Sequence, residues 1–366
     1  MEYVMLKDVC TINMGQSPDS DSYNDNGEGV PFFQGNADFG ERYPVTRKWC
    51  SAPTKMAISE DILISVRAPI GALNYAKEEC CIGRGLAALT PDKTKVSSEF
   101  IFWLLKGKNA ELNSKGTGST FKAIGRKVLE ETKVPDIPLE KQLEHSKILE
   151  KIYTVIQHRK SELQMLDDII KARFVEMFGN GHDGFCNTKK LGEFCKFQQG
   201  TQVPVEEQIE EQLEGYTRFL RIIDYTQAPQ IPRYVSVKGR EIAEDSVVIV
   251  RYGATAGFVG HGYAGILANN LFEVVPDESI LSKDFLYLAL KYGTFEQEVH
   301  DKAFGAAMPA LSFGMMNDIG VVTPNSTAQN GFVDFVHQVD KSKFAVQKSL
   351  KETKLLFDSL MQQYFG

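Results

Sequence analysis

The chain has 366 residues, of which 43% are hydrophobic and 24% are charged, and its formal net charge is −7. These values are typical of a soluble globular protein of about two domains, and they exclude a disordered, collagen-like or disulfide-dense chain. The acidic balance disfavours unaided, non-specific binding to nucleic acid. No stretch approaches the ~18 apolar residues of a membrane-spanning helix, and the start of the chain lacks a signal-peptide core, so we expect a cytoplasmic protein.

Residues 1–138 have the pattern of one α/β (α+β) globular domain. Turn signals such as Gly15-Gln-Ser-Pro18 alternate with short β-rich runs, of which Ile62-Leu-Ile-Ser-Val66 is the clearest. A short amphipathic helix is expected at residues 100–105, and a glycine-rich loop follows it. A last strand leads into Pro135 and Pro138, after which the composition changes.

Residues 139–179 are predicted to form one long helix. Residues 140–178 contain no glycine or proline, and at ~1.5 Å per residue such a helix would be roughly 60 Å long. Its apolar positions are spaced alternately by three and four residues, which is the periodicity of a coiled coil. The predicted seam consists of Leu149, Ile152, Ile156, Leu163, Leu166 and Ile170.

The remainder of the chain repeats the first half. Residues 58–67 correspond to residues 242–251 at an offset of 184, and the ends of the two long helices correspond at an offset of 187. Residues 180–325 are therefore predicted to be a second globular domain, and residues 326–366 a second long helix. Its seam consists of Val336, Val339, Val346, Leu350, Phe357 and Leu360.

The two long helices are expected to pack on each other as an antiparallel coiled coil. Arg159 and Arg173 interrupt the first seam, and Lys343 and Thr353 interrupt the second, but the repeat equivalent of each interruption is apolar. A long amphipathic helix needs a partner for its apolar stripe. The alternative is that each helix packs only on its own globular domain.

Nothing in the sequence predicts catalysis or a metal site. The chain lacks a P-loop, a G-x-G-x-x-G turn after a strand, and the Asn/Asp-Pro-Pro-Tyr/Phe motif of adenine methyltransferases. Its six cysteines include no C-x-x-C pair, and its histidines have no repeated ligand spacing. We therefore expect reduced cysteines, no metal, no cofactor of its own and no enzymatic activity.

The ordered, duplicated motifs identify a resemblance to a known family. Gly15-Gln-Ser-Pro18, Pro31-Phe-Phe-Gln-Gly35, Asp61-Ile-Leu-Ile-Ser-Val-Arg67, Gly118-Ser-Thr-Phe-Lys-Ala-Ile124 and Val134-Pro-Asp-Ile-Pro-Leu-Glu-Lys-Gln142 precede the first long helix. Together they resemble the specificity (S) subunits of Type I restriction-modification systems over the full chain. The second half departs from the pattern, because Asn325-Ser-Thr-Ala-Gln329 replaces Leu139-Glu-Lys-Gln142. This departure puts the docking surface of the second helix in question.

The resemblance implies a DNA-recognition subunit. Residues 1–138 and 180–325 would be two target-recognition domains related by a pseudo-two-fold axis, each recognising one half of a bipartite target. The helices at residues 139–179 and 326–366 would set the spacer between the halves and dock methyltransferase subunits. The implied partners are double-stranded DNA, two methyltransferase (M) subunits and restriction (R) subunits, with no membrane. S-adenosylmethionine, ATP and Mg are expected on those partners, and the assembled complex would carry methyltransferase and ATP-dependent endonuclease activity.

Charge and side-chain chemistry indicate candidates for DNA contact. Residues 106–127 form the most basic stretch, and residues 180–325 carry a net charge of −7. Arginine and lysine can bind phosphates, while asparagine and glutamine can recognise adenine. Arg67 and Arg251 are taken as repeat-equivalent. The candidates are Gln16, Ser17, Gln34, Arg67, Arg84, Lys108, Lys115, Thr117, Ser119, Thr120, Lys122, Gln199, Arg218, Arg221, Tyr225, Arg251, Tyr252, Asn269 and Asn270.

Two other function classes remain open from the residues alone. One is a scaffold that does not bind DNA, built as a coiled-coil adaptor with duplicated interaction domains. The other is a fused nuclease or methyltransferase, which the missing motifs disfavour.

Overall fold

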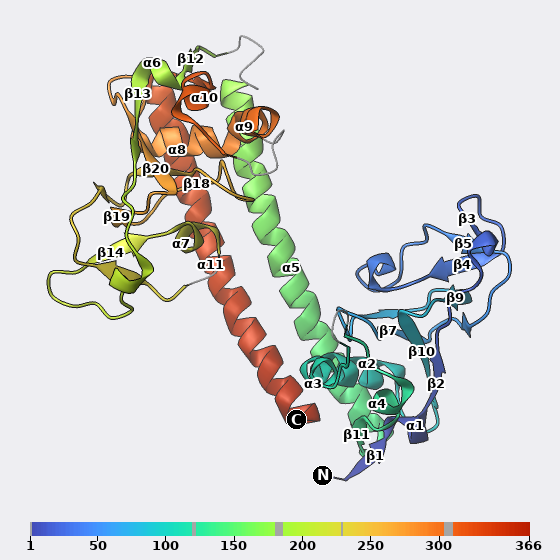
Figure 1. Cartoon of the computed structure of the whole chain (residues 1–366). Helices are drawn as coiled ribbons and strands as arrows, with labels where there is room; N and C mark the ends of the chain where they lie inside the picture. The colour runs from blue at the N-terminus through green and yellow to red at the C-terminus, as the bar shows by residue number, and fades with distance from the viewer. Residues whose placement is uncertain (1, 119–121, 180–185, 228–229, 304–309) are drawn as a thin grey trace. The chain divides into compact units, whose positions relative to one another are not determined.

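The computed structural model describes residues 2–118, 122–179, 186–227, 230–303 and 310–366. It divides the chain into two compact units, one formed by residues 1–160 and 348–366, the other by residues 161–347. The long helices α5 (Leu139–Phe178) and α11 (Ser326–Phe365) each contribute one half to either unit. Figure 1 shows them as the green and red helices.

In its described residues, unit 1 contains three antiparallel or mixed sheets, and four α-helices and two 3-10 helices precede α5. Its sheets have the strand orders β1-β11, β2-β10-β7-β8 and β3-β5-β4-β9-β6. The strands are β1 (Tyr3–Met5), β2 (Cys10–Met14), β3 (Tyr23–Asn24), β4 (Val30–Phe33), β5 (Trp49–Cys50), β6 (Met56–Ala57), β7 (Ile62–Ser65), β8 (Leu73–Tyr75), β9 (Cys80–Ile82), β10 (Leu86–Pro91) and β11 (Lys133–Pro135). The helical elements are α1 (Leu6–Val9), η1 (Ser20–Ser22), η2 (Asn36–Asp38), α2 (Ser98–Gly107), α3 (Asn109–Ser114) and α4 (Arg126–Glu130).

Unit 2 repeats this arrangement. Its sheets have the strand orders β12-β21, β13-β20-β17-β18 and β15-β14-β19-β16. The strands are β12 (Thr188–Lys190), β13 (Cys195–Gln199), β14 (Thr217–Leu220), β15 (Arg233–Val235), β16 (Glu241–Ile242), β17 (Val247–Val250), β18 (Val259–Gly260), β19 (Gly265–Leu267), β20 (Leu271–Pro276) and β21 (Gly320–Val322). The helical elements are α6 (Leu191–Phe194), η3 (Val205–Glu207), α7 (Ile222–Thr226), α8 (Lys283–Tyr292), α9 (Phe295–Ala303) and α10 (Phe313–Asn317).

The strand register corrects one detail of the predicted repeat. Ser65 pairs with Leu86 in unit 1, and Val250 pairs with Leu271 in unit 2. Ser65 is therefore equivalent to Val250, and Leu86 to Leu271, each at an offset of 185. Arg67 is therefore equivalent to Tyr252, and the prediction that Arg67 matches Arg251 is wrong by one residue. Successive side chains of a strand point to opposite faces, so the two arginines do not share a place in the fold.

Within each unit the two long helices run antiparallel. In unit 1 the first part of α5 lies beside the last part of α11, where the rings of His145 and Tyr364 stack with centroids 3.8 Å apart. In unit 2 the last part of α5 lies beside the first part of α11, where the ring centroids of Phe174 and Phe332 are 5.4 Å apart. The prediction of an antiparallel pair is confirmed inside each unit, and the helices also pack on the core of their own unit.

The predicted seam positions are all buried or half-buried. Leu149 and Ile170 are fully buried, and Ile156, Val336, Val339, Val346 and Leu350 are at most 9% exposed. Lys343, which interrupts the seam, places its Nζ 2.6 Å from the Asp167 carboxylate, so the charge within the helix pair is compensated.

A buried glutamine connects each long helix to the domain it follows. In unit 1 the Gln142 side chain accepts from Ser97 N–H at 3.0 Å and donates to the Lys95 and Ile137 carbonyls. In unit 2 Gln329 makes the same three bonds with Ser282, Ile280 and Pro324. The different sequence before Gln329 therefore did not change how the second helix begins.

Three further expectations can be compared with the described residues. All six cysteines lie in this part of the chain and carry no disulfide. In the same part no group of three or more His, Cys, Asp or Glu residues could hold a metal ion. None of the described helices combines the length and the apolar character needed to cross a membrane.

Candidate nucleic-acid interface

In unit 1 three loops meet at the ends of the central strands. The loop after β2 donates Gly15 N–H to the Leu86 carbonyl at 2.9 Å and Gln16 N–H to the Ile82 carbonyl at 3.0 Å. The loop before β10 donates Gly83 N–H to the Phe33 carbonyl, at the end of β4, at 2.8 Å. These backbone bonds hold the three loops in one cluster, so the side chains that they carry share one surface.

Glycine makes this close approach possible. A Cβ atom at Gly15 would lie 2.2 Å from the Gly83 carbonyl oxygen, and one at Gly85 would lie 2.4 Å from the Gln34 carbonyl oxygen. Neither distance can be tolerated, so any side chain at these two positions would separate the loops.

Polar side chains surround the glycines of this cluster. Gln16, Gln34 and Arg84 are exposed, and the Ser17 hydroxyl accepts the Arg84 N–H at 3.3 Å. All four are candidates from the sequence, and the structure brings them together. Amide and guanidinium groups at a loop surface can donate to base edges or phosphates.

Arg67, Thr117 and Lys122 form a second group in unit 1. Ile124 donates its N–H to the Val66 carbonyl at 2.9 Å, which brings the loop after α3 next to Arg67. Arg67, Thr117 and Lys122 are all exposed. The candidates Ser119 and Thr120 lie outside the described residues.

The other cations of the basic stretch have local partners. Lys108 and Lys115 both bind Glu111, at 3.3 and 2.6 Å, because they are three and four residues from it on or beside α3. Lys106 lies with its Nζ 3.8 Å from the centroid of the Tyr153 ring. Burial lowers the pKa of Lys106 to about 8. Helical spacing therefore directs most of these charges to local partners.

Unit 2 builds the corresponding loop cluster on the same backbone pattern. Gly200 N–H donates to the Leu271 carbonyl at 3.0 Å, and Arg251 N–H donates to the Asn270 carbonyl at 2.9 Å. The candidate Gln199 is exposed and donates its side-chain amide to the Asn269 carbonyl at 3.2 Å. Asn269 and Asn270 are half-buried, and Asn270 Oδ1 has no hydrogen-bond partner among the described residues.

Arg251 and Tyr252 lie at the edge of this cluster. The Arg251 Nε donates to the Leu311 carbonyl at 3.3 Å, and its guanidinium lies 4.8 Å from the Tyr252 ring centroid. Tyr252 is 39% exposed. Arg251 is thus held against backbone and aromatic groups, while Tyr252 occupies the place that Arg67 has in unit 1.

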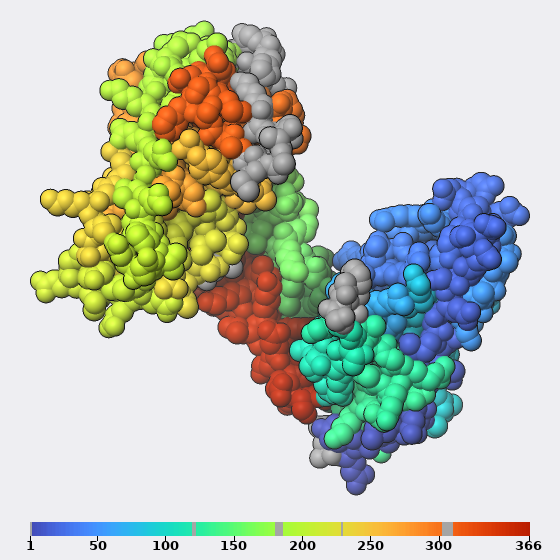
Figure 2. All heavy atoms as spheres, viewed as in Figure 1, coloured from blue at the N-terminus to red at the C-terminus, as the bar shows by residue number. Residues whose placement is uncertain are grey.

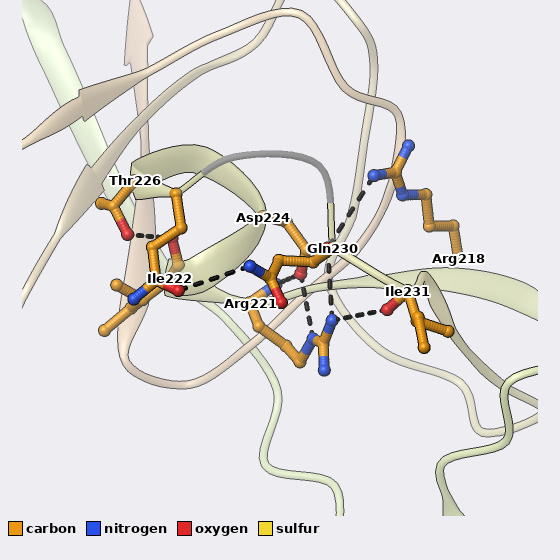
Figure 3. Close-up of polar contacts among 8 residues, drawn as sticks. Arg218, Arg221, Ile222, Asp224, Thr226, Gln230 and Ile231 are labelled. Atoms are coloured by element: carbon orange, nitrogen blue, oxygen red, sulfur yellow. Dashed lines mark hydrogen bonds and ion pairs between the residues drawn. The ribbon is translucent and has the colours of Figure 1, made fainter. Parts of the chain in front are cut away.

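A cluster of two arginines around one carboxylate lies at the end of β14 (Figure 3). The Asp224 side chain is 1% exposed and accepts from the Arg221 Nε at 3.0 Å, and the Arg218 Nη2 is 3.8 Å from its other oxygen. The Arg218 guanidinium also lies 4.4 Å from the Tyr263 ring centroid. Two cations against one anion leave a local positive charge in the more acidic half of the chain.

Tyr225 is half-buried, and its hydroxyl is buried. Its hydroxyl has no partner among the described residues, and burial, with the nearby Asp224 carboxylate, raises the pKa of Tyr225 well above its usual value. We infer a packing role for the Tyr225 ring against Tyr263, whose centroid is 5.3 Å away. Asp224 was not among the candidates from the sequence, although the spacing Arg-x-x-Asp at a helix start was visible.

The two loop clusters lie on the surface of their own units. Figure 2 shows blue atoms on the surface of unit 1 and yellow-green atoms on the surface of unit 2, and the exposed candidates Gln16, Gln34 and Gln199 belong to these parts of the chain. The side chains of both clusters are therefore accessible to a large partner.

Comparisons with known proteins agree with one another. The model of the family "Type I restriction modification DNA specificity domain" matches residues 1–165 and 186–354. The MjaX specificity subunit of Methanocaldococcus jannaschii, named for a type I restriction enzyme, is 46% identical over 156 residues, which are 43% of this chain and 37% of that protein. The MjaIX specificity subunit of the same organism is 22% identical over 335 residues, 82% of this chain and 75% of that protein.

Solved structures show the same fold. The S subunit of a type I restriction-modification system from M. genitalium has a TM-score of 0.61 at 16% identity and covers 100% of this chain and 96% of its own. A chain from another type I restriction-modification system has a TM-score of 0.60 at 17% identity, with coverages of 100% and 97%.

Proposed function

The chain belongs to the family of Type I restriction-modification DNA specificity domains, and from this we propose that it is the sequence-specific DNA-recognition subunit of such a complex. The observation that carries the proposal is the duplication of one loop cluster on two equivalent frames, with different polar side chains on each. Two frames that hold different side chains fit a target of two unlike halves.

We propose that the helix pair α5 and α11 sets the spacer and docks the partner subunits. The helices carry large exposed apolar side chains that a partner could cover, among them Met165 at 59%, Phe344 at 71% and Leu355 at 62% exposed. Exposed apolar groups of this size on paired helices are typical of protein–protein interfaces. The partners would be two methyltransferase subunits and restriction subunits, together with double-stranded DNA, in the cytoplasm.

The chemistry of the complex would belong to those partners. S-adenosylmethionine, ATP and Mg would bind the methyltransferase and restriction subunits, and this chain would supply the choice of sequence. Its acidic net charge is consistent with a subunit that gains part of its DNA affinity from its partners.

The spacer proposal can be tested by lengthening both helices. An insertion of seven residues near Leu163 in α5 and near its repeat equivalent Leu350 in α11 would add about 10 Å, which is about 3 base pairs. Methylome sequencing of cells with the complete complex should then find the same half-sites separated by a longer spacer. A seven-residue insertion beside the exposed Glu211 is the control and should leave the spacer unchanged.

The scaffold alternative makes a different prediction for DNA. With the methyltransferase partner present, a gel-shift assay should show tighter binding to a bipartite target than to random DNA. Equal affinity for both DNAs would contradict the recognition function and favour the scaffold.

A further inference from the structure

Gln34 and Arg221 occupy the same place in the two units. In unit 1 the Phe33 carbonyl, at the end of β4, accepts the Gly83 N–H at 2.8 Å. In unit 2 the Leu220 carbonyl, at the end of β14, accepts the Ala268 N–H at 3.0 Å. Each strand also pairs in parallel with its neighbour, β4 with β9 and β14 with β19. The residue that follows is therefore Gln34 in one unit and Arg221 in the other.

A carboxylate fixes the backbone of both residues. Asp38 accepts the Gln34 N–H at 2.8 Å, and Asp224 accepts the Arg221 N–H at 2.9 Å. Both aspartates belong to the short helical segment that follows, η2 or α7. The carboxylate is four residues after Gln34 and three residues after Arg221, so the anchors differ in spacing, but in both units a carboxylate holds the backbone N–H of this position. The two units differ in the side chain that leaves it.

The two side chains differ in how they are held. Gln34 is exposed, and none of the hydrogen bonds found among the described residues engages its amide. Arg221 presents Nε and Nη2 to the buried Asp224 carboxylate at 3.0 and 3.3 Å, and Nη2 also donates to the Ile231 carbonyl at 3.0 Å (Figure 3). These bonds leave the two Nη1 hydrogens without a partner among the described residues and fix their direction.

We propose that Gln34 and Arg221 are equivalent base-recognising residues, Gln34 for an adenine in one half-site and Arg221 for a guanine in the other. The proposal rests on the DNA-recognition function proposed above. The glutamine amide matches the N6 donor and N7 acceptor of adenine, and the two remaining Nη1 hydrogens of Arg221 match the O6 and N7 acceptors of guanine. Asp224 is the positioning residue of Arg221, because a fixed guanidinium loses less freedom when it binds a base.

Because Gln34 and Arg221 are equivalent positions, the experiment exchanges their side chains. The variants Gln34→Arg and Arg221→Gln are each assembled with the methyltransferase partner, and bound sequences are selected from randomised double-stranded DNA. We expect Arg221→Gln to lower the preference for guanine at one base pair by about 5- to 150-fold, the range for a bidentate contact, and to leave the other half-site unchanged. Gln34→Arg should change one base pair of the other half-site only.

Two further variants test whether Asp224 positions the Arg221 side chain or only supports the fold. Arg221→Lys keeps the charge but loses the Nε and Nη2 bonds that fix the direction of the free donors, so it should lose discrimination at the same base pair while the salt dependence of binding is kept. Asp224→Asn should weaken discrimination at that base pair as well. Lys283→Gln, which removes an equal charge from α8 in the same unit, is the matched control and should leave the selected sequence unchanged.

Several results would overturn the proposal. One is an unchanged selected sequence for both Gln34→Arg and Arg221→Gln when the wild-type complex selects a bipartite target. Another is an Asp224→Asn complex that binds all sequences more weakly with the same base preference, which would give Asp224 a structural role alone. If the wild-type complex selects no bipartite target, the recognition function itself fails, and this outcome is distinguishable from the others.

Discussion

The two units have the same frame and differ in the polar groups that the frame holds. The strand order β2-β10-β7-β8 recurs as β13-β20-β17-β18, and the glutamine before each long helix keeps its three hydrogen bonds. In contrast, the loop cluster has Gln34 where unit 2 has Arg221. The comparison teaches that backbone anchors are retained while the outward side chains vary, as two half-sites of unlike sequence require.

The interior also differs between the units. Asp61 in unit 1 accepts the Ile58 N–H at 2.9 Å, and its equivalent Ser246 in unit 2 accepts the Ala243 N–H at 3.2 Å. Asp61 binds the Thr90 hydroxyl, whereas Ser246 donates to the buried Glu273, which also binds Arg240. The same turn is therefore closed by a carboxylate in one unit and by a hydroxyl in the other.

The largest difference in stability between equivalent positions of the two units is expected where the long helices meet. Phe332 is fully buried against Phe174 and Phe178, whereas its repeat equivalent His145 is half-buried and stacks only on Tyr364. Phe332→Ala should lower the free energy of unfolding of unit 2 by about 4 kcal/mol. His145→Ala should cost unit 1 about 1 kcal/mol, the value of one aromatic pair. Hydrogen exchange followed by mass spectrometry measures each unit separately. Equal costs would contradict the comparison.

The buried glutamines should instead behave alike. Gln142→Leu and Gln329→Leu each remove three hydrogen bonds and leave one buried N–H and two carbonyls without that partner, so each should cost about 3 kcal/mol. Gln338→Leu, an exposed position on α11, is the control and should cost less than about 0.5 kcal/mol. A large difference between the two buried variants in urea unfolding would show that the frames are not equivalent.

The sequence predicted the helices more accurately than the strand register. Residues 140–178 contain no glycine or proline and have a regular seam, so α5 was predicted almost to the residue. The runs Ile62–Ser65 and Val247–Val250 are buried on both faces, so no alternation marks their register, and the one-residue error at Arg67 and Arg251 follows from this.

The equivalence of Gln34 and Arg221 could not be found from the sequence. The strands before them are short, and the loops that lead to β4 and β14 differ in length and composition, so no motif aligns them. It becomes visible only through the hydrogen bonds of Phe33 and Leu220. The pairing of Lys108 and Lys115 with Glu111 was visible as helical spacing and was not used in the sequence analysis.

The Asp61 carboxylate that closes this turn should make the stability of unit 1 depend on pH, whereas Ser246 at the equivalent turn of unit 2 should not. Burial raises the pKa of Asp61, and hydrogen bonds from Thr90 and Ile58 only partly oppose this. A carboxyl group whose folded pKa is raised stabilises the fold at low pH, and that stabilisation is lost as the pH rises through the folded value. Asp61→Ser, which copies unit 2, should therefore gain stability relative to the wild type as the pH rises above about 4, the usual pKa of an aspartate. A constant difference between the two proteins in urea unfolding as the pH rises would contradict the prediction.

The smallest predicted effect compares two equivalent lysines on α2 and α8. Burial lowers the pKa of Lys106 to about 8, whereas Lys291, an exposed residue, has a raised pKa because the phenol groups of Tyr287 and Tyr292 outweigh its desolvation. Lys291 donates to the Tyr287 hydroxyl at 3.1 Å, and Phe102, which occupies the place of Tyr287 in unit 1, has no hydroxyl to offer. A lysine with a depressed pKa favours folding as the pH rises and loses this contribution as the pH falls through the folded value.

Removing the Tyr287 hydroxyl from unit 2 should make the pKa of Lys291 more like that of Lys106. Tyr287→Phe should lower the pKa of Lys291, and NMR titration of the Cε resonance would measure it. The change should be confined to Lys291, so Lys106 in the same protein is an internal control. An unchanged Lys291 would mean that burial, rather than the missing hydroxyl, separates the two sites. A fall would show that the Tyr287 hydroxyl contributes to the raised pKa of Lys291, together with Tyr292, whose place Gly107 takes in unit 1.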